Sequence, residues 1–194
     1  MALQLATLLL AAFLAAPAHA QTAPHPKRGG SLWLDAGFGY GYLSLTCTNC
    51  SAVAAHGTAV TVSAGFTAAQ NVLLGLQVQQ WSSSQAELGQ TESSLLIVVQ
   101  WYPWPATGFF LRAGNGIVRG PGSQAANAPF ASTQGTGVGF ALGIGYDVKV
   151  NRRLGVTVQA ATNISALGDL TLGGQAANDV IAYVTRVGVA IVLR

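Results

Sequence analysis

Residues 137–146 read GVGFALGIGY, and bulky apolar residues occupy every second position of this stretch. The bulky positions are Val138, Phe140, Leu142, Ile144 and Tyr146, and the positions between them hold only glycine and alanine. A period of two residues puts neighbouring side chains on opposite faces of a β-strand, whereas a helix would repeat every three to four residues. The stretch therefore predicts a strand with one apolar face and one face of very small side chains.

Seven further segments of the chain alternate in the same way. They cover residues 32–43, 58–66, 72–81, 92–101, 108–117, 153–159 and 181–193. Most are about 9–12 residues long, which suits a tilted strand that crosses a bilayer. The connections alternate between short ones near 68–70, 103–105 and 149–151 and long ones over 44–57, 82–91, 118–136 and 164–179. Short turns at one end and long loops at the other are typical of bacterial outer-membrane barrels.

The composition argues against an ordinary soluble domain and against a helical membrane protein. Only 8% of the residues are charged, compared with roughly 25% in an average soluble protein. Beyond the N-terminus no apolar run reaches the roughly 20 residues that a membrane-spanning helix needs. A closed barrel is the other way to satisfy the backbone in lipid. We therefore predict an all-β fold, an eight-stranded antiparallel up-and-down transmembrane β-barrel, with its apolar face toward lipid.

A soluble barrel such as a lipocalin is the main alternative, with the apolar face inside. The opposite face then has to meet water, yet it carries few of the lysines and glutamates that protect exposed strands.

A formal net charge of +3, with no run of Lys or Arg, gives no support to nucleic-acid binding.

The N-terminal sequence MALQLATLLLAAFLAAPAHA predicts a signal peptide over residues 1–20, with cleavage after Ala20. An uncleaved membrane anchor is the alternative. Residues 21–30 form a short flexible lead-in, and residues 31–194 form the barrel domain. The protein is then exported to the outer membrane of a Gram-negative cell.

Several polar residues fall on the lumen face of the predicted strands: Asp35, Gln77, Gln79, Arg112 and Arg186. Buried charges need partners, so we expect a polar network in the lumen. The first and last strands become neighbours on closure, which suggests that Asp35 pairs with Arg186. The network is either a structural plug, because an eight-stranded barrel barely exceeds its own side chains, or a polar constriction in a narrow channel. The many inward glycines, which leave lumen volume unfilled, support the channel.

Aromatic residues fall on the outward face near both ends of the strands. Two interfacial girdles are predicted, with scattered core aromatics as the alternative. Phe66, Trp101, Phe109 and Tyr146 lie near the short turns, and Tyr40, Tyr42 and Tyr183 lie near the long loops.

Cys47 and Cys50 form a CxxC pair in the first long loop. An oxidising envelope favours a structural disulfide between them. Redox and metal roles remain alternatives, although no cationic neighbour is visible and two cysteines are too few for a closed zinc site. We expect no cofactor and no metal.

Catalytic residues are hard to assemble from this sequence. After residue 20 the only histidines are His25 and His56, and Ser51 is the nucleophile nearest to His56. No carboxylate is placed to orient that histidine, so no enzyme is predicted. Glu87, Glu92 and Asp169 lie in or beside predicted loops and are interpreted as solvated charges.

Three stretches, residues 37–50 (GFGYGYLSLTCTNC), 100–114 (QWYPWPATGFFLRAG) and 137–158 (GVGFALGIGYDVKVNRRLGVTV), resemble the small outer-membrane barrels of the OmpA/OmpX-like class. The resemblance implies contact with outer-membrane lipid and lipopolysaccharide, and insertion by the barrel-assembly machinery. The class usually ends in an aromatic residue, whereas this sequence ends Val192-Leu193-Arg194. A structural or surface-interaction role is expected, through loops whose ligand the sequence does not reveal. A narrow diffusion pore and a lipid-modifying enzyme are the alternatives.

Overall fold

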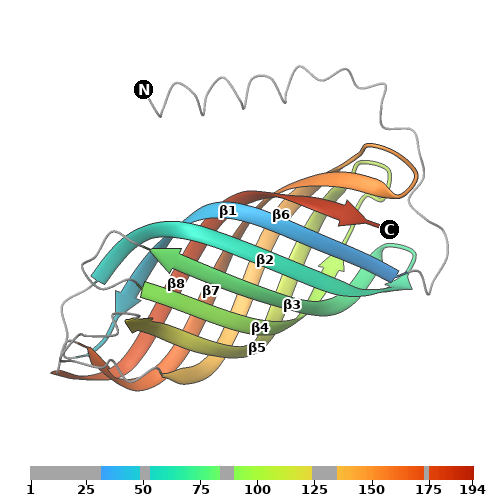
Figure 1. The fold of residues 1–194 in the computed structure, drawn as a ribbon. Helices are drawn as coiled ribbons and strands as arrows, with labels where there is room; N and C mark the ends of the chain where they lie inside the picture. Colours follow the sequence, from blue (N-terminus) through green and yellow to red (C-terminus); the bar gives the residue numbers. More distant parts are fainter. Residues whose placement is uncertain (1–31, 49–52, 84–89, 124–134, 173–174) are drawn as a thin grey trace, which may run out of the picture.

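A computed structural model describes residues 32–48, 53–83, 90–123, 135–172 and 175–194. These residues form eight strands that wind obliquely around a barrel, and β1 begins at the end of the barrel where β8 finishes (Figure 1). The strands are β1 (Leu32–Thr46), β2 (Val53–Ala69), β3 (Val72–Ser83), β4 (Gln90–Trp101), β5 (Phe109–Ser123), β6 (Thr136–Lys149), β7 (Leu154–Leu172) and β8 (Gln175–Leu193). The described residues contain no helix long and apolar enough to cross a membrane. The predicted signal peptide and lead-in lie outside the described residues.

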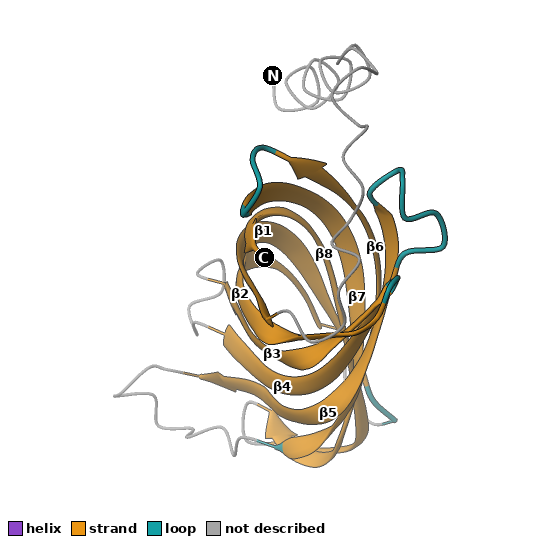
Figure 2. Ribbon diagram, turned by 90° about the vertical axis from the view of Figure 1, so that its right-hand side faces the viewer, coloured by secondary structure: helices purple, strands orange, loops and turns teal. Residues whose placement is uncertain are grey.

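The sheet closes on itself. Each strand pairs antiparallel with the next one along the chain, and β8 pairs antiparallel with β1, so that the strands form a ring in the end-on view (Figure 2). The predicted all-β, eight-stranded antiparallel barrel is therefore confirmed. Closure leaves no free sheet edge, which is what allows such a fold to exist in lipid.

The pairing register sets the inclination of the strands. Leu32 of β1 pairs with a residue of β2, which in turn pairs with a residue of β3, and so on around the barrel. After all eight strands this path returns to β1 at Tyr42, ten residues farther along the strand than Leu32. A shear of ten over eight strands corresponds to a strand tilt of about 40°. Ten residues at this tilt span roughly 25 Å along the barrel axis, the height of the apolar band on such barrels.

The outward face is apolar and exposed, and the inward face is buried. Outward Phe38, Ile97 and Val187 are 57%, 56% and 61% exposed, whereas inward Trp33 is only 4% exposed. These outward side chains form a continuous apolar surface around the barrel, which is larger than a water-soluble protein tolerates. The outward direction of the apolar face, predicted from the alternation, is therefore confirmed.

The inward glycines do not leave the lumen empty. A Cβ at Gly75 would lie 2.7 Å from the ring of Trp33, and a Cβ at Gly57 would lie 2.7 Å from the ring of Trp81. Phe110 covers Gly145 in the same way, since the two residues pair across β5 and β6. Large side chains thus fill the space above neighbouring glycines. At Gly57, Gly75 and Gly145 the expectation that inward glycines leave lumen volume unfilled is therefore wrong.

Two apolar clusters occupy the lumen. One lies toward the short-turn end and contains Trp33, Leu73, Leu96, Val98, Tyr102, Phe110 and Ala141. The other lies toward the long-connection end and contains Leu43, Leu45, Ala55, Ala59, Trp81, Val118, Leu167, Val180, Ala182 and Val184. Both ends of the interior are therefore packed with side chains.

Several strands run farther than the sequence predicted. The β7–β8 pairing continues to Leu172 and Gln175, so the loop expected over 164–179 is wrong, and only residues 173–174 separate the two strands. The pairing register shifts near Gly168, which adopts a φ of 69° that favours glycine. The prediction failed because strand segments beyond the bilayer no longer need an apolar outward face.

Candidate functional site

Arg112 is the centre of a polar network inside the barrel. Its Nη2 donates a hydrogen bond to Oδ2 of Asp35 at 2.7 Å, and the two side chains form a buried ion pair. Its Nε donates to Oε1 of Gln100 at 2.9 Å, and its Nη1 donates to Oε1 of Gln77 at 3.1 Å. Arg112 lies on β5 and Asp35 on β1, which are opposite strands in a closed ring of eight. The ion pair therefore crosses the lumen.

A second polar layer closes the lumen toward the short turns. The hydroxyl of Tyr102 donates to Oδ2 of Asp147 at 2.5 Å, and Thr157 donates to the other carboxylate oxygen at 2.5 Å. Arg194 forms an ion pair with Asp147 and donates to the hydroxyl of Tyr102. Its guanidinium also lies over the Tyr102 ring, 5.5 Å from the centroid. Asp147 is thus bonded from three sides.

Gln100 joins the two layers. Its amide nitrogen donates to the Tyr102 hydroxyl, while its amide oxygen accepts from Arg112. The eight residues of this continuous lumen network are Asp35, Gln77, Gln100, Tyr102, Arg112, Asp147, Thr157 and Arg194. They come from β1, β3, β4, β5, β6 and β7 and from the residues that follow β4 and β8.

Burial changes the pKa values of Tyr102 and Arg194 in the second polar layer, which lies at the short-turn ends of the strands. Burial raises the pKa of Tyr102 above its usual range, and Asp147 raises it further. The phenol therefore stays protonated and remains a donor. Burial lowers the pKa of Arg194, but Tyr102 and Asp147 raise it by more, so the net pKa lies above the usual value. Both groups are held in the protonation state that the hydrogen bonds need.

Three of the five predicted lumen residues join the network, namely Asp35, Gln77 and Arg112. Gln79 and Arg186 point inward and are buried, but neither forms a hydrogen bond or ion pair with the described residues. Asp35 and Arg186 do not form the direct ion pair that was suggested, although the Asp35 carboxylate still interacts electrostatically with the Arg186 guanidinium. Arg186 lies opposite Gly41, six residues farther along β1 than Asp35.

Gln100, Tyr102, Asp147, Thr157 and Arg194 were missed by the sequence analysis. Tyr102 and Arg194 follow the last residues of β4 and β8, where strand alternation no longer assigns a face. Gln100 and Thr157 occupy inward positions of strands that were found, so the alternation contained a signal for both.

Glu92 is not a solvated charge, contrary to expectation. It is 1% exposed, and neither carboxylate oxygen has a hydrogen-bond partner among the described residues. It lies on β4 opposite Trp81, where the β4–β5 register shifts. Like Glu92, four other residues with unpartnered buried atoms lie between the lumen network and the long connections: Gln79, Ser94, Asn163 and Ser165. The interior is thus least well satisfied between the lumen network and the apolar cluster at the long-connection end. Glu87 lies outside the described residues.

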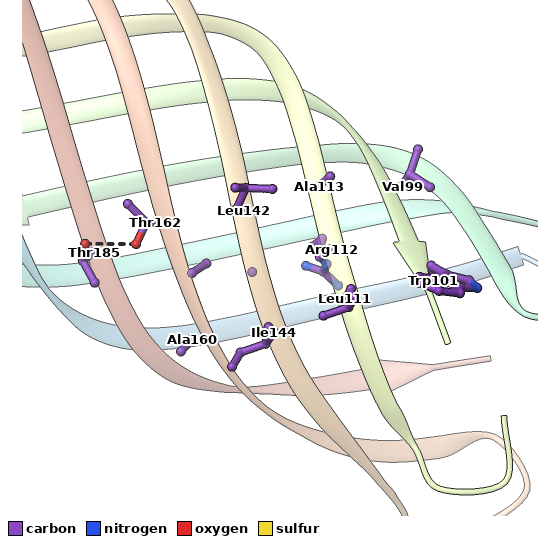
Figure 3. Close-up of a pocket in the computed structure, with 12 residues that line it drawn as sticks. Val99, Trp101, Leu111, Arg112, Ala113, Leu142, Ile144, Ala160, Thr162 and Thr185 are labelled. Atoms are coloured by element: carbon purple, nitrogen blue, oxygen red, sulfur yellow. Dashed lines mark hydrogen bonds between the residues drawn. The ribbon is translucent and has the colours of Figure 1, made fainter. Parts of the chain in front are cut away.

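A groove of about 610 Å³ lies on the outer wall and spans β4 to β8 (Figure 3). Small outward residues, including Ala113 and Ala160, form its floor, and Leu142 and Ile144 are among the larger residues that line it. Thr162 and Thr185 bond to each other there at 3.0 Å. The lining contains no histidine and no carboxylate. The groove faces lipid and therefore provides no path along the lumen.

The remaining predicted residues lie at the two ends of the outward face. Tyr40, Tyr42, Phe66, Trp101 and Tyr183 are exposed, and Phe109 and Tyr146 are half-buried and paired across β5 and β6. His56 packs against Tyr40 and Tyr42, with ring centroids 6.0 and 5.1 Å away. No carboxylate contacts His56 among the residues described.

Cys47 is disulfide-bonded and packs against the apolar cluster at the long-connection end. Cys50, Ser51 and His25 lie outside the described residues.

Comparisons with known proteins agree with this architecture. No protein-family model matches the chain, and a search of curated proteins finds no match. Neisserial surface protein A has a solved structure that aligns with a TM-score of 0.56 at 14% identity, covering 84% of this chain and 98% of that one. Ail of Yersinia pestis, solved with the heparin analogue sucrose octasulfate, aligns with a TM-score of 0.56 at 11% identity, covering 84% and 99%. The N-terminal β-barrel domain of OprF from Pseudomonas aeruginosa aligns with a TM-score of 0.51 at 13% identity, covering 85% and 99%. This chain therefore has the fold of the small eight-stranded β-barrels of the bacterial outer membrane.

Proposed function

We propose that this outer-membrane barrel has a closed lumen and a structural or surface-interaction role in the cell envelope. The observation that carries the proposal is the ion pair between Arg112 and Asp35, which joins opposite walls of the barrel at 2.7 Å. An interior of eight strands is only just wide enough for its own side chains. A bonded pair across its diameter therefore obstructs a continuous water path.

The packing above and below the ion pair supports the same conclusion. Asp147 and Arg194 form a second ion pair toward the short turns. Trp33 and Trp81 cover glycines that would otherwise widen the lumen. A narrow pore would need these separate layers to open together.

A surface role is supported by the strands that continue past the apolar band. Tyr42 lies near the upper edge of that band, while β7 and β8 remain paired through Leu172 and Gln175. The protein thereby raises backbone well above the membrane. Because the strands extend beyond the membrane while the lumen is closed, a role in presenting a surface is favoured over a role in transporting solutes.

We also propose that the protein is not an enzyme. His56 lies on the outer face among aromatic rings, and no carboxylate of the described residues orients it. Mass spectrometry of lipid A from cells with the wild-type protein, with His56→Ala and without the protein should give one identical profile. A modification that depends on His56 would refute this proposal.

The closed lumen is tested by conductance in a planar phospholipid bilayer. The wild-type barrel should show no steady single-channel conductance, whereas Arg112→Ala, which removes the central cation, should produce brief openings. Thr162→Ala on the outer wall is the matched control and should stay silent. Steady conductance of the wild-type protein would refute the closed lumen and establish the pore.

A further inference from the structure

The β6–β7 turn concentrates positive charge at the short-turn end of the barrel. Lys149, Arg152 and Arg153 are exposed and lie within five residues of one another. None of their side chains forms a hydrogen bond or ion pair within the part of the chain described. We call these three residues the basic rim patch.

The backbone beneath this patch is fixed by hydrogen bonds. Oδ1 of Asn151 accepts from the backbone N–H groups of Arg153 and Leu154, both at 2.8 Å. The N–H groups of Val150 and Asn151 donate to the carbonyl of Leu154 at 2.9 and 3.0 Å. Side chains on such a bonded turn lose less entropy on binding than those on a mobile loop.

Among the described residues, no carboxylate side chain forms an ion pair with the patch. Asp147 is the nearest acid along the chain, and it is engaged inside the lumen by Tyr102, Thr157 and Arg194. The other two short turns, residues 70–71 and 102–108, contain no charged residue. Within the described part of the chain, the exposed positive charge of the short turns therefore lies in one sector of the rim.

Apolar side chains accompany these cations. Val150 in the same turn is 59% exposed. Trp104 in the adjacent β4–β5 turn is 61% exposed, and its ring lies 5.8 Å from Phe109. The N–H of Asp147 bonds to the carbonyl of Gly108 at 2.9 Å, which ties the two turns together. Exposed tryptophan and cations just beyond an apolar band are suited to the headgroup level of a bilayer.

We infer that the basic rim patch binds the phosphate headgroup of an anionic phospholipid in the periplasm-facing leaflet. The three cations supply charge complementary to the phosphate, and Trp104 and Val150 lie beside the first carbons of the acyl chains. Lysine and arginine at a membrane surface each favour anionic lipid about five-fold. This inference rests on the membrane fold and holds whether or not the lumen conducts.

The experiment uses Trp104 as a reporter of the lipids around it. The full-length protein carries Trp101→Phe, because Trp33 and Trp81 are buried in the lumen and Trp101 is exposed nearby. It is reconstituted in phosphatidylcholine vesicles with a fixed mole fraction of chain-brominated phosphatidylglycerol or of chain-brominated phosphatidylcholine. Quenching of the tryptophan emission then measures the local proportion of each lipid.

Brominated phosphatidylglycerol should quench the emission of Trp104 to the extent expected if its mole fraction around Trp104 were at least five times its mole fraction in the vesicle. The combined variant Lys149→Gln, Arg152→Gln, Arg153→Gln should quench equally with both lipids. Arg119→Gln removes an exposed cation at the opposite end of the barrel and should keep the preference. A heat-shift gel confirms that each variant folds, and single Arg152→Gln and Arg153→Gln variants replace the triple variant if it does not. Equal quenching in the wild-type background, or a preference that persists in every folded patch variant, would overturn the inference.

Discussion

The guanidinium of Arg112 and the carboxylate of Asp35 meet at 2.7 Å although 77 residues separate them in the chain. They reach each other from opposite strands, and each is buried to more than 90%. A charge of this kind depends on its partner, because neither side chain can turn toward solvent.

Asp35→Ala should destabilise the barrel by about 3–5 kcal/mol, since it leaves the Arg112 cation buried without its counterion. The double variant Asp35→Ala, Arg112→Ala should cost less than the sum of the two single variants. Urea unfolding in phospholipid vesicles measures all four free energies of unfolding. Additive costs would mean that the pair contributes no coupling energy.

Gly145→Val should destabilise the barrel by about 1–3 kcal/mol, because the new side chain overlaps the ring of Phe110. Gly155→Ala is the matched control, since a Cβ there meets only the carbonyl oxygen of Val148 at 3.3 Å. Equilibrium unfolding of both variants tests the prediction. An equal cost at the two glycines would contradict the role given to the Phe110 ring.

Alkaline solution should weaken the wild-type barrel through Tyr102. Burial raises the pKa of this phenol in the folded state, so the unfolded chain loses its proton first as the pH rises past about 10. The stabilisation from Tyr102 is therefore complete below pH 10 and declines above it. The free energy of unfolding, measured from pH 8 to 11, should fall less steeply for Tyr102→Phe. Parallel pH profiles would exclude Tyr102 as the source.

The membrane barrel itself predicts a heat-dependent shift in gel migration. Detergent-extracted protein from the outer-membrane fraction should migrate differently before and after boiling, because the closed sheet resists detergent until it is heated. A soluble periplasmic protein with no shift would require the apolar face to point inward.

Strand positions were predictable because one property, the alternation of bulky apolar residues with small or polar ones, holds at most positions inside the bilayer. The stretch 137–146 falls within β6 as expected. The same rule fails above the bilayer, where β7 continues past Leu167 through Gly168 and Asp169, and β8 reaches Val180 through Asn178 and Asp179.

The network was predictable only in part. Alternation correctly assigned Asp35 and Arg112 to the inward face. Alternation does not show, however, how far along the barrel axis each side chain lies, and a charge can pair only with a partner at a similar position along that axis. The pairing of β8 with β1 places Arg186 opposite Gly41, six residues along β1 from Asp35, so these two side chains do not form an ion pair even though their strands are adjacent. The pairing register of all eight strands was needed to identify Arg112 as the partner of Asp35.

The extended β7–β8 hairpin has a consequence for local motion. Beyond Ala166 and Ile181, the pairs from Leu170↔Ala177 to Leu172↔Gln175 have no further strand of the described residues beside them. A two-stranded ribbon in water is marginally stable on its own. Its amide protons should exchange with solvent through local fraying, orders of magnitude faster than those of the barrel wall, which open only with the whole sheet. The protein therefore combines a barrel wall that opens only cooperatively with a two-stranded ribbon that opens locally, independently of the wall.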